Sequence, residues 1–153
     1  MKKIKIISGG QTGVDRIALE VAKELNINCG GTAPKGYITE NGNDYSLKDF
    51  NLIEHSSSKY PPRTRQNVKE SDGTVYIATD IKSRGLKLTE KISKGQNKPF
   101  ILNPTIEQFV DFVKDNNINV LNIAGNRGSK LSTDQSEYIR EFLKNSLKSI
   151  LSE

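Results

Sequence analysis

The sequence predicts an α/β fold in which a doubly wound, mostly parallel sheet is flanked by helices on both faces. Short apolar runs of strand type alternate along the chain with segments of helical periodicity. Glycine-containing turns follow three of these runs. No repeat or low-complexity tract divides the chain, so we expect one domain over residues 1–153.

The bulk composition is typical of a globular protein of one domain. Hydrophobic residues make up 34% of the 153 residues and charged residues 27%. No apolar run approaches the length of a membrane span, and a strand pattern begins directly after the first residues. The single cysteine, Cys29, excludes an internal disulfide framework. These features predict a cytoplasmic protein without a membrane partner, and they leave a homo-oligomer open.

The first predicted unit is a strand over residues 3–8, a glycine loop and a helix that ends near Asn26. A strand, a glycine turn and a helix point backbone N–H groups at an anion, and glycine lets a phosphate approach the backbone. The alternative is that the glycines serve only helix–strand packing. The loop residues that we expect to face a ligand are Gly9, Gly10, Gln11, Thr12, Gly13, Asp15 and Arg16.

Charge divides the roles within this loop. Arg16 can grip a phosphate, whereas Asp15 would repel one. We therefore expect Asp15 to accept from ligand hydroxyl or N–H groups, or to brace an arginine. The loop matches neither the P-loop pattern nor a complete dinucleotide-binding fingerprint, because Gly10-x-x-Gly13 is only a fragment of the latter.

The middle of the chain alternates short strands with irregular segments. Strands are predicted at 27–31 and 51–55, separated by a long connection at 32–48 that carries Lys35 on a constrained Pro-Lys-Gly turn. A loop over 56–62 leads through two prolines into a polar helix, on which Arg63 and Asn67 share one face. The lone histidine, His55, is interpreted as a strand residue rather than a base.

The second half continues the alternation. Strands are predicted at 74–78, 98–102 and 119–124, with a helix to about residue 94 after the first. Thr105 is expected to cap one helix, and Ser132 with Gln135 to form a capping box on the last. The predicted buried stripes of these two helices are Ile106, Phe109, Val110 and Val113, and Tyr138, Ile139, Phe142, Leu147 and Ile150.

Glycine turns at Gly9, Gly85 and Gly125 each follow a predicted strand. Ligands of open parallel sheets bind beyond the carboxyl ends of the strands. We therefore expect all three turns to open onto one crevice.

Basic residues point to the same crevice. The net charge is +5, yet only six of the 23 basic residues are arginines, and five of those fall near predicted strand ends. Arginine suits planar, bidentate contacts to phosphate or carboxylate groups. Specific nucleic-acid binding is not favoured, because aromatic content is 7% and no basic run interleaves with aromatics. The arginines are Arg16, Arg63, Arg65, Arg84, Arg127 and Arg140.

Five motifs follow one another along the chain: residues 8–16, the Pro-Lys-Gly turn at 34–36, the segment 63–74 with its Arg-Thr, Asn-Val and Ser-Asp-Gly-Thr elements, the pair Leu88-Thr89, and residues 121–125. Together they resemble the putative molybdenum carrier family, a circularly permuted branch of the SLOG superfamily. The resemblance covers nearly the whole chain. It implies a Rossmann-like domain that binds a nucleotide or a nucleotide-like phosphorylated ligand, and the family's name implies molybdenum cofactor.

The chain departs from this family at one turn. Where relatives carry Gly-Gly-Thr, this chain has Arg84-Gly85-Leu86, which supplies its own cation. LOG-type hydrolases, which the family resembles in fold, need an acidic residue in the helix that follows this turn. The matching position of this chain holds Thr89, and the acidic Glu90 follows it directly. The sequence itself offers no metal site, because one histidine and one cysteine cannot form a ligand cluster.

The leading hypothesis is a protein that carries, senses or sequesters a nucleotide-derived small molecule. Beyond the glycine loop, its expected ligand-binding residues are Lys35, Arg63, Asn67, Arg84, Gly85, Thr89, Gly125 and Arg127. One alternative is a hydrolase of an N-glycosidic or phosphoester bond, with Asp15, Asp72 or Glu90 as acid or base. Another is a DNA-binding protein of related fold.

Overall fold

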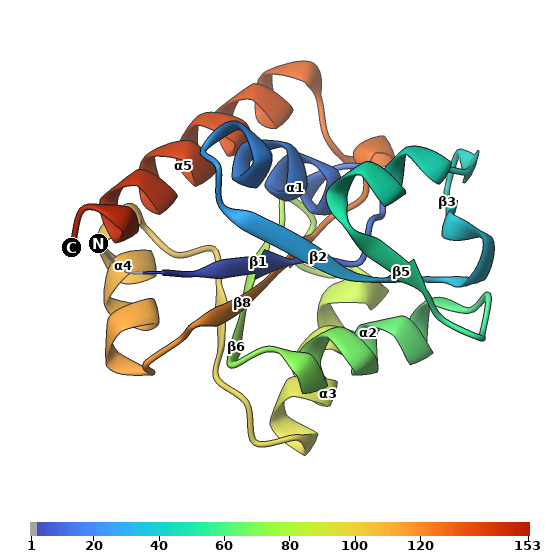
Figure 1. The fold of residues 1–153 in the computed structure, drawn as a ribbon, viewed down its shortest axis with the longest axis horizontal. Helices are drawn as coiled ribbons and strands as arrows, with labels where there is room; N and C mark the ends of the chain where they lie inside the picture. Colours follow the sequence, from blue (N-terminus) through green and yellow to red (C-terminus); the bar gives the residue numbers. More distant parts are fainter. Residues whose placement is uncertain (1–2) are drawn as a thin grey trace.

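A parallel sheet of six strands forms the centre of the computed structural model, which describes residues 3–153 (Figure 1). Its strand order is β5-β2-β1-β8-β6-β7, and every neighbouring pair runs in parallel. The predicted parallel α/β fold is therefore confirmed. The strands are β1 (Lys5–Ile7), β2 (Asn28–Ala33), β5 (Leu52–Glu54), β6 (Gly73–Ile77), β7 (Phe100–Leu102) and β8 (Val120–Gly125).

Helices cover both faces of this sheet, as a doubly wound fold requires. In Figure 1, α1 and α5 lie on one face and α2 and α3 on the other, and α4 packs against α5. The chain moves outward from β1 through β2 to β5, then crosses to the other half of the sheet, so β1 and β8 meet at the switch point. The helices are α1 (Val14–Glu24), α2 (Tyr60–Glu70), α3 (Arg84–Gly95), α4 (Ile106–Asp115) and α5 (Thr133–Leu151).

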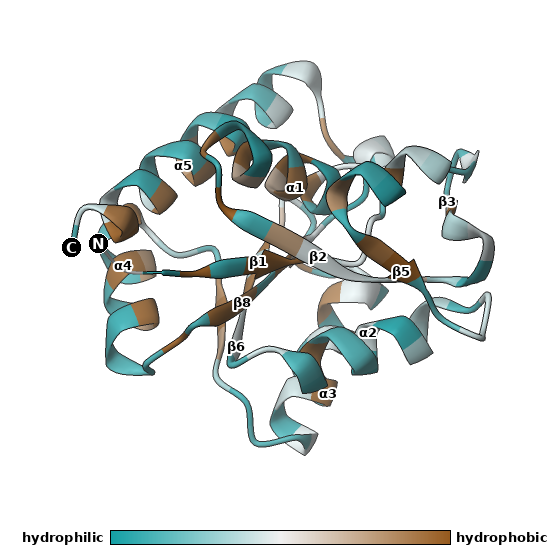
Figure 2. Cartoon of the chain, viewed as in Figure 1, coloured by the Kyte–Doolittle hydropathy of each residue, from teal (hydrophilic) through white to brown (hydrophobic). Residues whose placement is uncertain are grey.

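The core lies between the sheet and the helix faces turned toward it. Ile6 of β1 pairs in register with Leu121 of β8, and both side chains are fully buried. Figure 2 shows the same partition, with hydrophobic residues on the central strands and hydrophilic residues on the outer helix faces. Strands buried on both faces explain why these runs are nearly continuous in apolar residues.

The predicted helix caps are present, but two predicted core residues are exposed. Thr105 and Ser132 each form a capping box with the glutamine three residues later. Ile139 and Leu147 of α5 are buried as predicted, whereas Tyr138 is 72% exposed and Ile106 is 38% exposed. The prediction for Ile106 was wrong because it is the first residue of α4, at the solvent-facing end of the helix. The prediction for Tyr138 was wrong because a neighbour of Ile139 lies about 100° around the helix, beyond the buried stripe.

The connection at 32–48 is more ordered than predicted. It contains two short 3₁₀ helices, η1 (Lys35–Tyr37) and η2 (Tyr45–Phe50), with a hairpin of β3 (Ile38–Thr39) and β4 (Gly42–Asn43) between them. Helix α2 begins at Tyr60, earlier than predicted, so that its prolines lie in the first turn, where they are tolerated. Among residues 3–153, no helix is long and apolar enough to cross a bilayer.

Candidate functional site

A cavity of about 870 Å³ opens at the carboxyl ends of β1, β8 and β6, between helices α2 and α3. Gly9, Gly85 and Gly125 all line it, which confirms that the three turns face one crevice. The remaining lining residues are Gln11, Asp15, Tyr60, Pro61, Arg63, Thr64, Asn67, Tyr76, Asp80, Lys82, Ser83, Arg84, Leu88, Thr89, Asn122, Ala124, Asn126, Arg127 and Lys130.

Arg63 reaches across the glycine loop to a buried carboxylate. Its Nη1 lies 3.5 Å from Oδ2 of Asp15, whose side chain is only 3% exposed. A Cβ atom on Gly9 would lie 1.7 Å from the same Nη1, so the guanidinium occupies the space that glycine leaves free. The expectation that Asp15 braces an arginine is confirmed, and Gly9 makes the contact sterically feasible.

The carboxyl group of Asp15 sits in a strongly perturbed environment. Burial raises its pKa above the ordinary value, against the opposing effects of Arg63, the N–H groups of Gln11 and Gly9, and the hydroxyl of Ser8. The N–H of Gln11 donates to Oδ2 at 3.1 Å. Arg63 is thus the main cation that favours the ionised carboxylate here.

Arg63 itself lacks acceptors. Its side chain is 12% exposed, yet no described residue accepts a hydrogen bond from it, and its Nε is buried without a partner. The ring of Tyr60 covers one side, with its centroid 5.4 Å from Cζ. Buried guanidinium N–H groups without acceptors are unfavourable unless a ligand satisfies them.

The opposite side of the cavity is more strongly cationic. Among the described residues that line this side, the only carboxylate is that of Asp80, which pairs with Lys130 at 2.5 Å. This pairing lowers the pKa of Asp80, because the Lys130 ammonium donates to the carboxylate. Four cationic side chains line this side, those of Lys82, Arg84, Arg127 and Lys130.

Three residues that the sequence analysis did not single out organise the floor and wall. The hydroxyl of Tyr76 is buried, which raises its pKa to about 12 and keeps it a neutral donor. Asn126 Oδ1 accepts from the N–H groups of Thr79 and Asp80, and its Nδ2 donates to Ser83 Oγ, the cap of α3. Asn122 lies on the floor and donates to Thr74. No local pattern identifies these residues, because their partners are distant in sequence.

Some predicted ligand-binding side chains are committed to the fold. Asn67 holds both the N–H and the carbonyl of Thr32, at 2.8 and 2.9 Å, and so fastens α2 to β2. Thr89 donates to the carbonyl of Gly85 one turn earlier in α3. Both line the cavity, but their polar groups already have partners.

Most of the glycine loop serves packing rather than the cavity. Gly10 and Gly13 do not line it, and both have positive φ. A Cβ on Gly13 would lie 2.4 Å from the backbone oxygen of Asn126, and one on Gly10 would lie 2.7 Å from the Leu47 side chain. At these two positions the structure agrees with the packing alternative.

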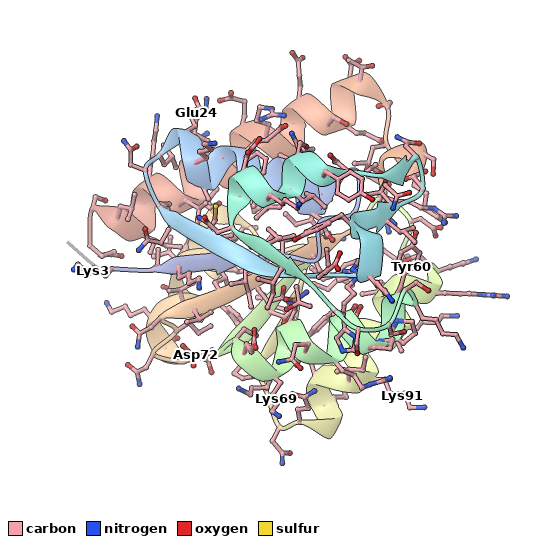
Figure 3. All side chains as sticks on the ribbon, turned by 45° about the vertical axis from the view of Figure 1, so that its right-hand side comes forward. Lys3, Glu24, Tyr60, Lys69, Asp72 and Lys91 are labelled. Carbon is pink, nitrogen blue, oxygen red and sulfur yellow. The ribbon has the colours of Figure 1, made fainter. Side chains whose placement is uncertain are left out.

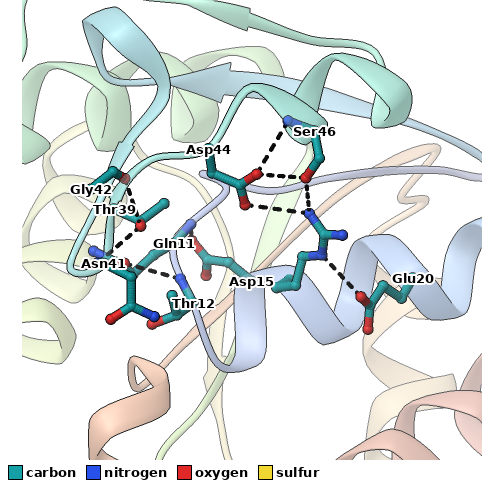
Figure 4. A network of polar contacts seen from close by, with 10 residues as sticks. Gln11, Thr12, Asp15, Glu20, Thr39, Asn41, Gly42, Asp44 and Ser46 are labelled. Atoms are coloured by element: carbon teal, nitrogen blue, oxygen red, sulfur yellow. Dashed lines mark hydrogen bonds and ion pairs between the residues drawn. The ribbon is translucent and has the colours of Figure 1, made fainter.

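The side chains of Gln11 and Thr12 hold the neighbouring hairpin. Gln11 Oε1 accepts from the N–H of Thr12, as Figure 4 shows. It also accepts from the N–H of Glu40, and the Thr12 hydroxyl contacts the Glu40 carboxylate. Ser129 also donates its N–H to this carboxylate. These donors are already used within the chain, and Thr12 lies outside the cavity.

Arg16 faces away from the cavity, contrary to expectation. Its guanidinium contacts Glu20 at 2.9 Å, Ser46 at 2.8 Å and Asp44 at 3.4 Å, and Figure 4 marks these three contacts with dashed lines. Its guanidinium also lies 4.6 Å from the ring centroid of Phe50. Arg16 does not line the cavity, and its Nε and Nη1 are engaged outside it, so its side chain is not placed to hold a phosphate there.

Lys35, Asp72 and Glu90 also lie outside the cavity. Lys35 is exposed on η1. Asp72 accepts from the N–H groups of Asn119 and Val120 at the start of β8, the opposite edge of the sheet. Figure 3 shows Asp72 and Tyr60 at opposite ends of α2. Of the three carboxylates proposed as acid or base, only Asp15 reaches the cavity.

Metal ligands do not come together in residues 3–153. Within that range, no three histidine, cysteine or acidic side chains form a cluster that could hold a metal ion. Cys29 is buried in β2, where its pKa is raised by burial. The cavity instead offers cations and hydrogen-bond donors, which suit an anion.

Comparison with known proteins agrees with this fold and assigns the family. The model of the circularly permutated YpsA SLOG family matches residues 6–147. The chain belongs to this family. It is also similar to the crystal structure of a putative molybdenum carrier protein from Syntrophus aciditrophicus SB, with 36% identity and a TM-score of 0.81 over 97% of this chain and 95% of that one. No curated protein is significantly similar.

Proposed function

We propose that this SLOG-family protein binds a nucleotide-derived or nucleotide-like phosphorylated small molecule in the 870 Å³ cavity and thereby carries, senses or sequesters it. The observation that carries the proposal is Arg63, a guanidinium 12% exposed at the cavity wall with no hydrogen-bond acceptor in the described chain. The guanidinium lies in the space that the missing Cβ of Gly9 leaves, so the glycine permits this position at the cavity wall. A ligand acceptor at this point would remove the cost of burying a guanidinium without an acceptor.

Molybdenum cofactor is one candidate, because a neighbour of this fold is named a putative molybdenum carrier protein. The cavity fits the organic, anionic part of such a ligand. Arginine and lysine side chains would hold its phosphate by charge-assisted hydrogen bonds. Within residues 3–153, no cysteine or histidine lines the cavity to ligate the metal directly.

The hydrolase alternative receives less support. General acid–base cleavage needs a carboxylate within reach of the scissile bond. Asp72 and Glu90 lie outside the cavity, and Asp15 is engaged by Arg63 and the N–H of Gln11. The arrangement of these groups favours binding without turnover.

Native mass spectrometry of gently purified protein tests the proposal. We expect wild type to carry a phosphorus-containing small molecule, and Arg63→Ala to lose it. Arg65→Ala is the matched control, because Arg65 is exposed on the same helix and does not line the cavity. A wild type that carries no such ligand and is not stabilised by any nucleoside phosphate would overturn the proposal.

A further inference from the structure

We infer that the two ends of the cavity bind chemically different parts of one ligand. The Arg63 end takes the uncharged acceptor edge of an aromatic heterocycle, and the end formed by Lys82, Arg84, Arg127 and Lys130 takes a phosphoryl group. This assignment rests on the proposed function and adds the ligand's orientation within the same cavity.

Charge separates the two ends. At the Arg63 end, the guanidinium is paired with the nearly buried Asp15, so a ligand phosphoryl group there would face a carboxylate 3.5 Å from the same arginine. At the other end, one carboxylate, Asp80, stands against four cationic side chains. A phosphoryl group is therefore favoured at the second end and opposed at the first.

Surface chemistry separates them in the same way. Tyr60 and Pro61 line the cavity beside Arg63, from the first turn of α2. The Tyr60 ring lies 5.4 Å from the guanidinium carbon, so N–H donors at the edge of the guanidinium remain for a ligand. A flat ring that buries its faces on apolar atoms and accepts at its edge satisfies both features.

The distance between the ends sets the spacing of the two ligand groups. Arg63 lies over Gly9, which follows β1, whereas Arg84 begins α3, which follows β6. Strand β8 lies between β1 and β6. Two strand spacings amount to about 10 Å between the backbone positions of Gly9 and Arg84, and a sugar-sized spacer between the ring and the phosphoryl group matches this separation. A 5′-mononucleotide has this arrangement.

Dissecting the ligand tests the assignment. The probes are the four common nucleoside 5′-monophosphates, their nucleosides, and ribose 5-phosphate, titrated by calorimetry into wild type, Arg63→Ala and Arg84→Ala. Arg65→Ala serves as the matched control. Arg63→Lys is added because it keeps a cation beside Asp15 and guards against misfolding of the alanine variant.

We expect a crossed pattern for the nucleotide that binds best. Arg63→Ala and Arg63→Lys should weaken the nucleotide and its nucleoside at least tenfold and leave ribose 5-phosphate unchanged. Arg84→Ala should weaken the nucleotide and ribose 5-phosphate at least threefold and spare the nucleoside. If Arg63→Ala weakens ribose 5-phosphate as much as the nucleotide, the orientation is wrong while the proposed function stands. A wild type that binds none of the probes also overturns the assignment, and the separate search for a co-purified phosphorus-containing ligand then decides whether the proposed function fails with it.

Discussion

Arg16 and Arg63 lie on opposite sides of the same glycine loop, and they differ in what surrounds them. Arg16 contacts Glu20, Asp44 and Ser46 on the outer side of α1, through its Nε and Nη1 atoms. Arg63, on the cavity side, has one carboxylate at 3.5 Å and no hydrogen-bond acceptor among residues 3–153. Both residues are arginines close to the same loop in the sequence, but of the two only Arg63 lines the cavity, where it can donate to a ligand.

Glycines repeat this contrast. Gly13 is required by backbone, because its missing Cβ would meet the oxygen of Asn126 at 2.4 Å. Gly9 is required by a side chain, the end of Arg63. Flexible side chains can move, whereas backbone of the core cannot, so the same substitution should have different consequences at the two positions.

Alanine at these glycines gives the largest expected effects. Gly13→Ala should lower the free energy of unfolding by about 2–4 kcal/mol, because its φ of 83° disfavours a side chain and the backbone cannot yield. Gly9→Ala should cost about 1–2 kcal/mol, because Arg63 can swing away. Urea unfolding measures both values.

For ligand binding the order of the two glycines should be reversed, with the larger effect at Gly9. Gly9→Ala displaces Arg63, so it should remove the co-purified ligand as fully as Arg63→Ala does. A Gly9→Ala protein that keeps its ligand would show that the position of Arg63 over the loop is not needed for binding.

Replacing the two arginines sharpens the comparison directly. Arg63→Ala should weaken binding of the best nucleoside monophosphate by about 1.5–3 kcal/mol, the value of a hydrogen bond to a charged group. Arg16→Ala should change that affinity by less than about 0.5 kcal/mol, since its partners lie outside the cavity. Calorimetric titration checks both. Equal losses would indicate a general charge effect instead of a site.

Much of the fold could be predicted because its signals are local. The run before each glycine turn is apolar, and the helices carry caps and periodic stripes, so alternating strands and helices follow from neighbouring residues. Parallel order then places Gly9, Gly85 and Gly125 at one edge. This step needs only the general behaviour of α/β sheets.

Side-chain roles were harder to predict because they depend on distant partners. Arg16 is paired with Asp44 and Ser46, 28 and 30 residues later, on a segment expected to be irregular. Asn126 holds a loop 46 residues away, and Asn67 holds β2. Sequence periodicity does not reveal such contacts. The sequence therefore placed Arg16 near the glycine loop but could not predict whether its side chain faces the cavity or the outer side of α1.

Replacing Glu40, which joins the β3–β4 hairpin to the glycine loop, should have an effect of intermediate size on stability. Glu40→Gln should lower the free energy of unfolding by about 1 kcal/mol, because the carboxylate accepts from Thr12 and Ser129. Ligand affinity should stay unchanged, since Glu40 does not line the cavity. Glu137→Gln is the control, an exposed residue of α5 for which the described chain shows no polar partner. A loss of ligand in Glu40→Gln alone would mean that the hairpin belongs to the site.

The smallest effect on stability is expected at Glu20, whose carboxylate forms ion pairs with Arg16 at 2.9 Å and Arg140 at 2.7 Å. Burial acts to raise the pKa of Glu20, but its hydrogen bonds and ion pairs with the two arginines outweigh burial and lower the pKa below 4.5. A carboxyl with a lowered folded-state pKa stabilises the protein above its ordinary pKa, and that stabilisation is lost as the pH falls through the lowered value. Because the side chain is 33% exposed, Glu20→Gln should cost only about 0.5–1 kcal/mol at neutral pH. Urea unfolding at neutral pH and well below 4.5 should show this difference shrinking toward zero in acid. A difference that persists in acid would mean that Glu20 stabilises the outer side of α1 by packing, and that Arg16 is not held there by charge.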